Sequence, residues 1–401
     1  MPVSKSLSAP HFRVSSRPSL GRRGSLALAA ATLCALSSIG AAAPQSKMDQ
    51  VSYVDGNGRA RSHRGVVQEN TLERTVIEVD GSKKRVDSDK VTGITFGAVP
   101  ESYNDAVAYF DRRDFENAAK SFQVAAGDGA SSDVVKASAR MLAARSWMSH
   151  GAADPSGFGE AQTQVDALLA SYPDNRDVPA ARLLLARAKR MAGDAAGAAE
   201  EYKALYAQAT PEGTATGYSA ELCYEAGLGA AQASLTAGDV DGANALFNEV
   251  SSRVASLLAG MNENDVSFRA MTGIGAEARL GEGFCLLARG SNSQARTFFQ
   301  GQLSSAPKTG ALRQGARLGL AEALLAGERY REASIEFAKV NATDFSNRDR
   351  MARSLLGLAQ CYLNLPDTDG RQQAKTRLEA VRAHYGDTPS ALRAQELLKT
   401  L

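Results

Sequence analysis

A pattern of small and bulky residues recurs seven times along the chain, and it limits the folds that the chain can adopt. In the clearest copy, residues 311–340, the first half carries the small residue Ala321, and the second half carries Ala333, Phe337 and Val340. Spacings of four and three residues place these last three side chains on one face of a helix. The copy therefore predicts two antiparallel helices. A helix pair of this size cannot bury both of its faces alone, so the copies must stack on one another.

The same positions align in all seven copies. The Ala that marks the second helix occurs at Ala118, Ala161, Ala198, Ala243, Ala295, Ala333 and Ala374. Four residues later stands a bulky apolar residue, in order Phe122, Val165, Tyr202, Phe247, Phe299, Phe337 and Leu378. Three residues further on, every copy except the fifth has an apolar residue: Ala125, Leu168, Leu205, Val250, Gln302, Val340 and Val381. The small residue of the first helix is Ala106, Ala144, Ala186, Ala231, Gly283, Ala321 or Gly357. Small residues at facing positions let two helices approach closely.

Turn sequences separate the helices of several pairs, at residues 113–115, 193–195 and 238–240 and at Gly327, and Pro173 and Pro307 follow two second helices. With these turns, the columns resemble the tetratricopeptide-repeat (TPR) family over residues 100–401, about three quarters of the chain. The resemblance implies an all-α, right-handed solenoid of about seven helix pairs whose first helices line a concave binding surface. Successive Ala markers lie 43, 37, 45, 52, 38 and 41 residues apart, whereas the family repeats every 34 or so. We therefore expect an irregular solenoid.

Two linkers between helices make the resemblance more specific. Residues 168–182 and 385–394 each close one helix with an aromatic residue and open the next after a polar turn that contains Pro. They are similar to linkers in bacterial envelope TPR proteins, such as the Tol-Pal cell-division coordinator and the TPR lipoprotein of outer-membrane assembly. This similarity implies a protein of the cell envelope. No lipidation motif precedes Cys34, which is unlike a lipoprotein.

The first 43 residues have the pattern of an export signal. They contain five basic residues and no acidic one, and residues 26–43 form an apolar, Ala-rich run that ends in small residues. This pattern predicts a secretory signal peptide over residues 1–43 and an exported, periplasmic or envelope-associated protein. An uncleaved membrane anchor is the alternative. Without these residues the formal charge changes from +2 to −3, so the basic pI is no argument for nucleic-acid binding.

A small β module is expected over residues 44–99, because Thr75, Ile77 and Val79 alternate with their neighbours and a turn signal follows. Antiparallel hairpins of this length have too little core to stand alone, so we expect them to pack on the first helices that follow. Basic residues form two groups, one of Arg59, Arg61, His63 and Arg64 and one of Lys83, Lys84 and Arg85. Either they bind an anionic cell-wall polymer or lipid, or they are solvated charges that protect an edge strand.

Catalytic and metal-binding motifs are scarce. His63, His150 and His384 lie in separate segments without partners at metal-ligand spacing, and no phosphate-binding loop or nucleophile elbow occurs. The sequence therefore predicts a non-enzymatic protein without a cofactor or metal. The cysteines after the signal, Cys223, Cys285 and Cys361, have no disulfide spacing and are predicted to be buried in helices. Trp147 is predicted to pack in the core rather than to stack on a ligand.

Candidate binding residues follow from the resemblance, which places one stripe of the first helices in the concave groove. The predicted partner-binding residues are Tyr103, Met141, Arg145, Leu183, Arg187, Gln232 and Phe284, beside the apolar residues Val107, Leu228 and Leu280. They predict a protein or peptide partner in the envelope. A second feature is an Arg that recurs four residues before the small residue, at Arg140, Arg182, Arg279, Arg317 and Arg353. This ladder either engages an acidic ligand or packs on neighbouring helices and pairs with local Glu.

Overall fold

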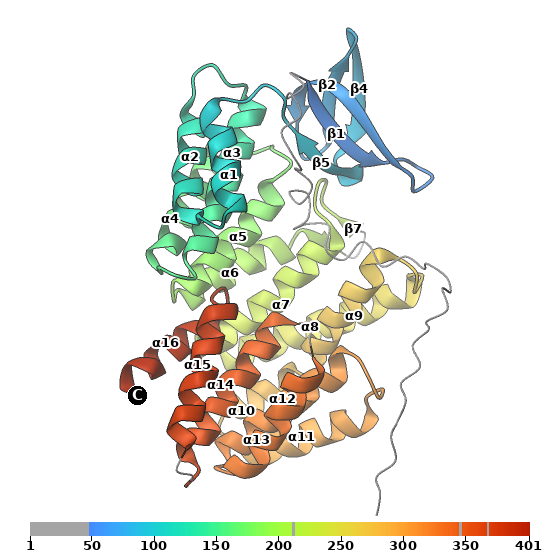
Figure 1. Ribbon diagram of the computed structural model, residues 1–401. Coiled ribbons are helices and arrows are strands. Elements are labelled where there is room, and N and C mark those ends of the chain that lie inside the picture. Colours follow the sequence, from blue (N-terminus) through green and yellow to red (C-terminus); the bar gives the residue numbers. More distant parts are fainter. Residues whose placement is uncertain (1–47, 211–212, 345–346, 367–368) are drawn as a thin grey trace, which may run out of the picture. The chain divides into compact units, whose positions relative to one another are not determined.

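The computed structural model describes residues 48–210, 213–344, 347–366 and 369–401 (Figure 1). The predicted signal segment, residues 1–43, lies outside the described residues. All described residues belong to one compact unit, Ile39–Leu401.

The N-terminal part of this unit is a five-stranded antiparallel sheet, which confirms the predicted β-hairpin module. Its strands are β1 (Asp49–Val54), β2 (Ala60–Asn70), β3 (Arg74–Val79), β4 (Ser82–Asp87) and β5 (Val91–Thr95), and a short 3-10 helix, η1 (Ser88–Lys90), precedes β5. The strand order is β4-β3-β2-β1-β5, with β4 and β5 at the edges. Asp80 and Gly81 both have positive φ, as a tight two-residue hairpin turn requires.

The rest of the chain forms seven helix pairs, here called units 1 to 7. The first helices are α1 (Glu101–Asp111), α3 (Asp133–His150), α5 (Val178–Met191), α7 (Ala220–Thr236), α9 (Val266–Arg279) with α10 (Gly281–Ala288), α12 (Ala311–Ala326) and α14 (Arg348–Asn364). The second helices are α2 (Phe115–Gly127), α4 (Ser156–Ser171), α6 (Ala195–Tyr206), α8 (Val240–Gly260), α11 (Asn292–Ser305), α13 (Tyr330–Thr343) and α15 (Gly370–His384). A last helix, α16 (Pro389–Thr400), packs on α15 and α14. The architecture is the TPR-like solenoid that the sequence predicts.

The aligned columns form the core. All seven Ala markers of the second helices are fully buried, and so are the small residues of the first helices. Gly357 shows why the small position matters, because a Cβ atom built on it would lie 2.2 Å from Cζ of Phe337 in the preceding unit. Glycine therefore lets the bulky residue of one unit reach the backbone of the next.

The turns within units use a left-handed residue followed by a helix cap. Gly193 and Gly238 have positive φ, and the side chains of Asp194 and Asp239 accept a hydrogen bond from a backbone N–H of the following helix. In unit 6 the left-handed residue is Glu328, which follows the C-cap Gly327.

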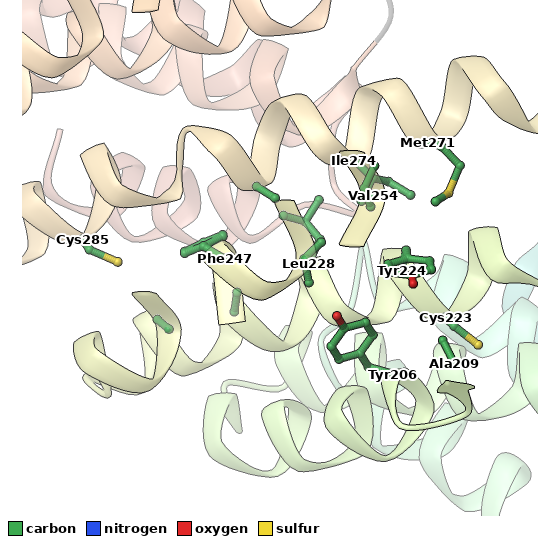
Figure 2. Packing of buried hydrophobic residues seen from close by; sticks show 14 residues of the cluster. Tyr206, Ala209, Cys223, Tyr224, Leu228, Phe247, Val254, Met271, Ile274 and Cys285 are labelled. Atoms are coloured by element: carbon green, nitrogen blue, oxygen red, sulfur yellow. The ribbon is translucent and has the colours of Figure 1, made fainter. Parts of the chain in front are cut away.

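Units 4 and 5 are the least regular. A two-stranded hairpin, β6 (Ala209–Thr210) with β7 (Gly213–Thr214), precedes α7. The first helix of unit 5 is interrupted at Leu280, where Gly281 approaches Phe247 of α8 so closely that an added Cβ would lie 2.1 Å from the ring. Figure 2 shows the buried apolar cluster of units 4 and 5, in which Val254 of α8 packs with Met271 and Ile274 of α9.

The predicted cysteines and the single tryptophan lie in the core. Cys223, Cys285 and Cys361 are buried and free. Burial raises the pKa of Cys223 to about 11 and that of Cys361 to about 12, so their reactive thiolate forms are rare near neutral pH. Trp147 is buried against Ala119, Ala161 and Ala188, which confirms the packing interpretation.

The β module is held to the helices by backbone pairing and by one arginine. Leu72 donates its N–H to the carbonyl of Asp174, and the N–H of Arg176 donates to the carbonyl of Asn70. The Arg176 guanidinium also donates to the carbonyl oxygens of Ser88, at 3.2 Å, and Val91. Val134 of α3 joins the apolar core of the sheet. The module thus packs on α3 and on the α4 to α5 linker, as expected of a sheet too small to stand alone.

Candidate interaction surface

Successive first helices contact one another from α3 onward, through α5, α7, α9, α12 and α14. Their side chains therefore form one continuous surface, here called the first-helix face. One stripe of this face consists of the residue after each small position, in chain order Val107, Arg145, Arg187, Gln232, Phe284, Glu322 and Leu358. A stripe with one side chain from each unit presents groups at nearly fixed intervals, which suits an extended partner.

Three of the predicted binding residues are mainly part of the packing. Met141 and Leu183 are buried, as are the neighbouring Leu228 and Leu280. Tyr103 is half-buried, with its ring edge-on to Phe122 and its hydroxyl 3.3 Å from Oγ of Ser138. Met141 and Leu183 have no side-chain surface for direct contact with a partner, because neighbouring first helices pack closely at their position.

The other four predicted residues keep exposed surface. Arg187 pairs with Glu225 on the next first helix. The side-chain oxygen of Gln232 accepts a hydrogen bond from Nη1 of Arg190 at 3.4 Å. The ring of Phe284 lies 4.8 Å below the guanidinium of Arg353, a distance suited to a cation–π contact. Each of these side chains is fixed by a neighbour from another unit. Their part in binding stays a prediction.

Arg145 lies within electrostatic range of a second arginine, Arg176. Within the described ranges its side chain has no carboxylate at ion-pair distance. Its neighbour Arg176 is buried against the β module, and burial lowers the pKa of Arg176; the carboxylate of Asp177 opposes this fall, and Arg145 adds a smaller contribution to it. Arg145 and Arg176, offset in part by Asp177, make this region attractive to a carboxylate.

Ion pairs that the sequence analysis missed link units 5, 6 and 7. Arg353 binds both carboxylate oxygens of Glu322, at 3.0 and 2.8 Å. The buried Arg350 donates from Nε to Asp344 and from Nη1 to Glu277, the latter at 2.7 Å. Burial raises the pKa of Glu277, and Arg350 opposes this rise. Only the pair of Arg353 and Glu322 joins successive first helices, and its two residues stand at different repeat positions, so no aligned column of the sequence marks these ion pairs.

Two of the five residues of the Arg ladder, Arg317 and Arg353, form ion pairs with carboxylates of this chain. Besides Arg353, the ladder residue Arg317 lies 3.5 Å from Glu336, and both side chains are largely covered. In unit 4 the ladder position is Gly227, where an added Cβ would lie 2.8 Å from both Tyr206 and Val250. The ring of Tyr206 fills that place. These contacts favour the packing interpretation over a ligand-binding strip.

A small cavity of about 240 Å³ opens on the first-helix face between units 6 and 7. It is lined by Glu322, Leu325, Phe337, Arg353, Leu356, Gly357 and Gln360. This volume suits a single side chain rather than a cofactor.

The described residues contain no group of three or more His, Cys, Asp or Glu residues arranged to hold a metal ion. In the same ranges, no helix is both long and apolar enough to cross a bilayer.

The solved structures that resemble this chain include two TPR or TPR-like proteins. One is a tetratricopeptide repeat protein from Parabacteroides merdae, with 16% identity, a TM-score of 0.47, and coverage of 75% of this chain and 98% of that chain. The other is a putative kinesin light chain with TPR-like repeats from Podosopora anserina, with 18% identity, a TM-score of 0.33, and coverage of 53% and 96%. No protein-family model and no curated protein matches the sequence. The TPR-like assignment rests on the seven repeated columns and their packing.

Proposed function

We propose that this TPR-like repeat protein is a non-enzymatic scaffold that binds a protein partner on its first-helix face. The observation that carries the proposal is the pair Arg145 and Arg187, which stand at the same position of neighbouring first helices and keep exposed surface. Arginine forms planar, two-pronged hydrogen bonds with carboxylates, so it is well suited to recognise acidic side chains of a partner.

The surroundings of these arginines support a preorganised surface. Arg187 is held by Glu225, and Arg190 beside it by Gln232. Side chains that are already ordered lose less conformational entropy when a partner binds. A face built on packed helices also keeps its groups in register, which favours a scaffold role.

Export to the bacterial envelope is part of this proposal. It is supported by the basic and then apolar pattern of residues 1–43 and by the envelope-type linkers at residues 168–182 and 385–394. We expect the purified native protein to begin near residue 44. An N-terminal sequence that starts within residues 1–10 would instead indicate a retained anchor or no export.

Reversing the charge of Arg145 or Arg187 tests whether the first-helix face binds the partner. Arg145→Glu and Arg187→Glu should each weaken capture of the partner from envelope extract by about ten-fold, because each replaces an attractive charge with a repulsive one. Arg331→Glu is the matched control, since Arg331 is exposed on the second helix α13. Crosslinking in intact cells, followed by quantitative mass spectrometry of the captured proteins, measures the change. If both face variants capture the same partner as well as the control does, the binding face is assigned wrongly.

A second candidate function is suggested by the edge strand β4. Lys83, Lys84 and Arg85 are exposed on it, and none of the three forms an ion pair with a described residue. These charges could bind an anionic envelope polymer or lipid. In that case the full chain should co-sediment with phosphatidylglycerol vesicles at low salt and be released at about 0.5 M salt, where charges are strongly screened. The variant Lys83→Glu/Lys84→Glu should lose binding, and equal binding by this variant would rule the function out.

A further inference from the structure

The cavity between units 6 and 7 marks a place where the packing of the repeats is incomplete. Its walls include Glu322 of α12, Phe337 of α13, and Gly357 and Gln360 of α14. In chain order these residues stand at the stripe position, the bulky position, the small position and three residues after the small position. Because the array repeats, the boundary between units 5 and 6 has a counterpart for each of them.

The counterparts between units 5 and 6 pack together. They are Phe284, Phe299, Ala321 and Leu324. The last three are buried in one apolar cluster, and the partly buried Phe284 packs against that cluster. The ring centroids of Phe284 and Phe299 are 5.1 Å apart. At this boundary, an aromatic ring from the stripe position therefore completes the packing.

Three differences in sequence remove apolar atoms from the next boundary. Glu322 stands in place of a phenylalanine, Gly357 in place of an alanine, and Gln360 in place of a leucine. The carboxylate of Glu322 accepts hydrogen bonds from Arg353 at 3.0 and 2.8 Å. What results is the cavity of about 240 Å³. Since a cavity of about 150 Å³ can hold benzene, this one has room for a phenyl ring.

Arg353 gives the cavity a wall that suits an aromatic ring. Its guanidinium lies 4.8 Å from the centroid of the Phe284 ring, so it already makes a cation–π contact within the chain. The two hydrogen bonds to Glu322 fix the orientation of this planar group. Arg353 also lines the cavity. A ring that enters the cavity therefore meets an oriented cation, which complements the negative face of an aromatic side chain.

We propose that this cavity is an anchor site for the protein partner and that it receives an aromatic side chain of that partner. The ring packs on Phe337 beside Arg353, as the ring of Phe284 packs on Phe299 at the preceding boundary. This inference rests on the proposed scaffold function and deepens it, because it names one side chain that the partner contributes. Glu322 belongs to the same stripe as Arg145 and Arg187, so the anchor lies on the proposed binding face.

A neutral peptide tests the cavity separately from the arginines of the face. The probe is acetyl-Gly-Ser-Phe-Ser-Gly-amide with para-fluorophenylalanine at its centre, and its binding to the full chain is followed by fluorine NMR. A single ring in a small cavity should bind with a dissociation constant of about 1 mM. Competitor peptides with leucine or alanine in place of the ring should bind at least about five-fold more weakly, since they lack the cation–π contact.

Two results of this titration would overturn the proposal. One is the absence of saturable binding up to about 10 mM peptide, well above the expected dissociation constant. The other is equal competition by the leucine peptide, which would show that the cavity does not select an aromatic side chain.

Two variants at one position separate filling of the cavity from loss of charge. Glu322→Phe supplies the ring that the preceding boundary has, so it should weaken binding of the probe at least about five-fold. Glu322→Gln is the matched control, because it keeps the size of the side chain and one hydrogen-bond acceptor for Arg353. It should bind the probe within about two-fold of the unmodified chain. Circular dichroism checks that both variants are folded, and equal affinities of the two would contradict the site.

A photoreactive probe locates the ring in the unmodified chain and does not depend on either variant. The same peptide with a diazirine-bearing phenylalanine should label α12 and α14, and mass mapping identifies the labelled residues. Labelling confined to other helices would place the ring elsewhere and overturn the proposal.

The two proposals fail in different ways. If the neutral peptide does not bind in the cavity, the anchor is assigned wrongly, yet Arg145 and Arg187 can still be required for capture of a protein partner. If capture does not depend on these arginines, the binding face is assigned wrongly, while binding of a peptide without carboxylates is unaffected.

Discussion

Replacing Phe337 with Ala should lower the free energy of unfolding by about 3 to 5 kcal/mol, the range for deleting a buried aromatic ring. Phe337 is fully buried, and its ring reaches the backbone of α14 at Gly357. The deletion leaves a void between units 6 and 7 that the helices cannot close without losing their register. Urea denaturation followed by circular dichroism measures the change.

Ile335→Ala is the matched control for this prediction. Ile335 lies on the same helix but is 50% exposed, so its truncation should change stability by less than about 1 kcal/mol. Similar losses for Phe337→Ala and Ile335→Ala would show that the bulky column does not hold the units together. A second, earlier transition in Phe337→Ala would show that the array has split at unit 6.

Arg350→Met should destabilise the chain by about 3 to 5 kcal/mol at neutral pH, because it removes the cation that pairs with the buried Asp344 and the half-buried Glu277. The Arg350 side chain is 6% exposed and that of Asp344 is 1% exposed. Methionine keeps much of the apolar stem while removing the charge and its hydrogen bonds. Exposed ion pairs contribute far less, so Arg393→Met, which removes the exposed pair with Glu396, should change stability by less than about 1 kcal/mol.

The pH dependence of this effect has a definite sign. Burial raises the pKa of Glu277 in the folded chain, so the folded state binds that proton more tightly than the unfolded state, and stability falls as pH rises through the folded pKa. Arg350 acts to lower this pKa. Its removal therefore raises the pKa further and increases the cost of keeping Glu277 ionised.

The stability difference between Arg350→Met and the unmodified chain should thus be large at about pH 7.5 and smaller near pH 4.5, where Glu277, with its raised pKa, accepts a proton. Urea denaturation at both pH values measures it. A difference that stays constant, or that grows on acidification, would show that the charge of Arg350 is not what stabilises this region.

Much of the helical fold follows from the sequence because its determinants are local and repeated. Ala333 and Phe337 are four residues apart and face the same way in any helix, so their burial is predictable from spacing alone. The break at Leu280 is different. It depends on the approach of Gly281 to Phe247, a residue of another helix, and no local signal marks it.

Of the predicted binding residues, Arg187, Gln232 and Phe284 keep exposed surface, and their part in binding stays a prediction. Family geometry placed these residues on first helices. It could not show that Met141 and Leu183 would be covered, because their burial depends on how closely neighbouring first helices pack. Nor could it reveal Arg176 as the tether of the β module, since that role arises only when two distant segments meet.

The ion pair between Arg350 and Glu277 joins unit 7 directly to unit 5, which is two repeats earlier in the array. In an ideal linear array each repeat is coupled only to its immediate neighbours, so the ends can fray one repeat at a time. The bond between Arg350 and Glu277 opposes fraying of single repeats, because unfolding of unit 7 breaks a contact that also stabilises unit 5. The C-terminal three units should accordingly form one cooperative block, with nearly equal hydrogen-exchange protection in α9, α12 and α14 instead of a gradient that declines toward the end of the chain.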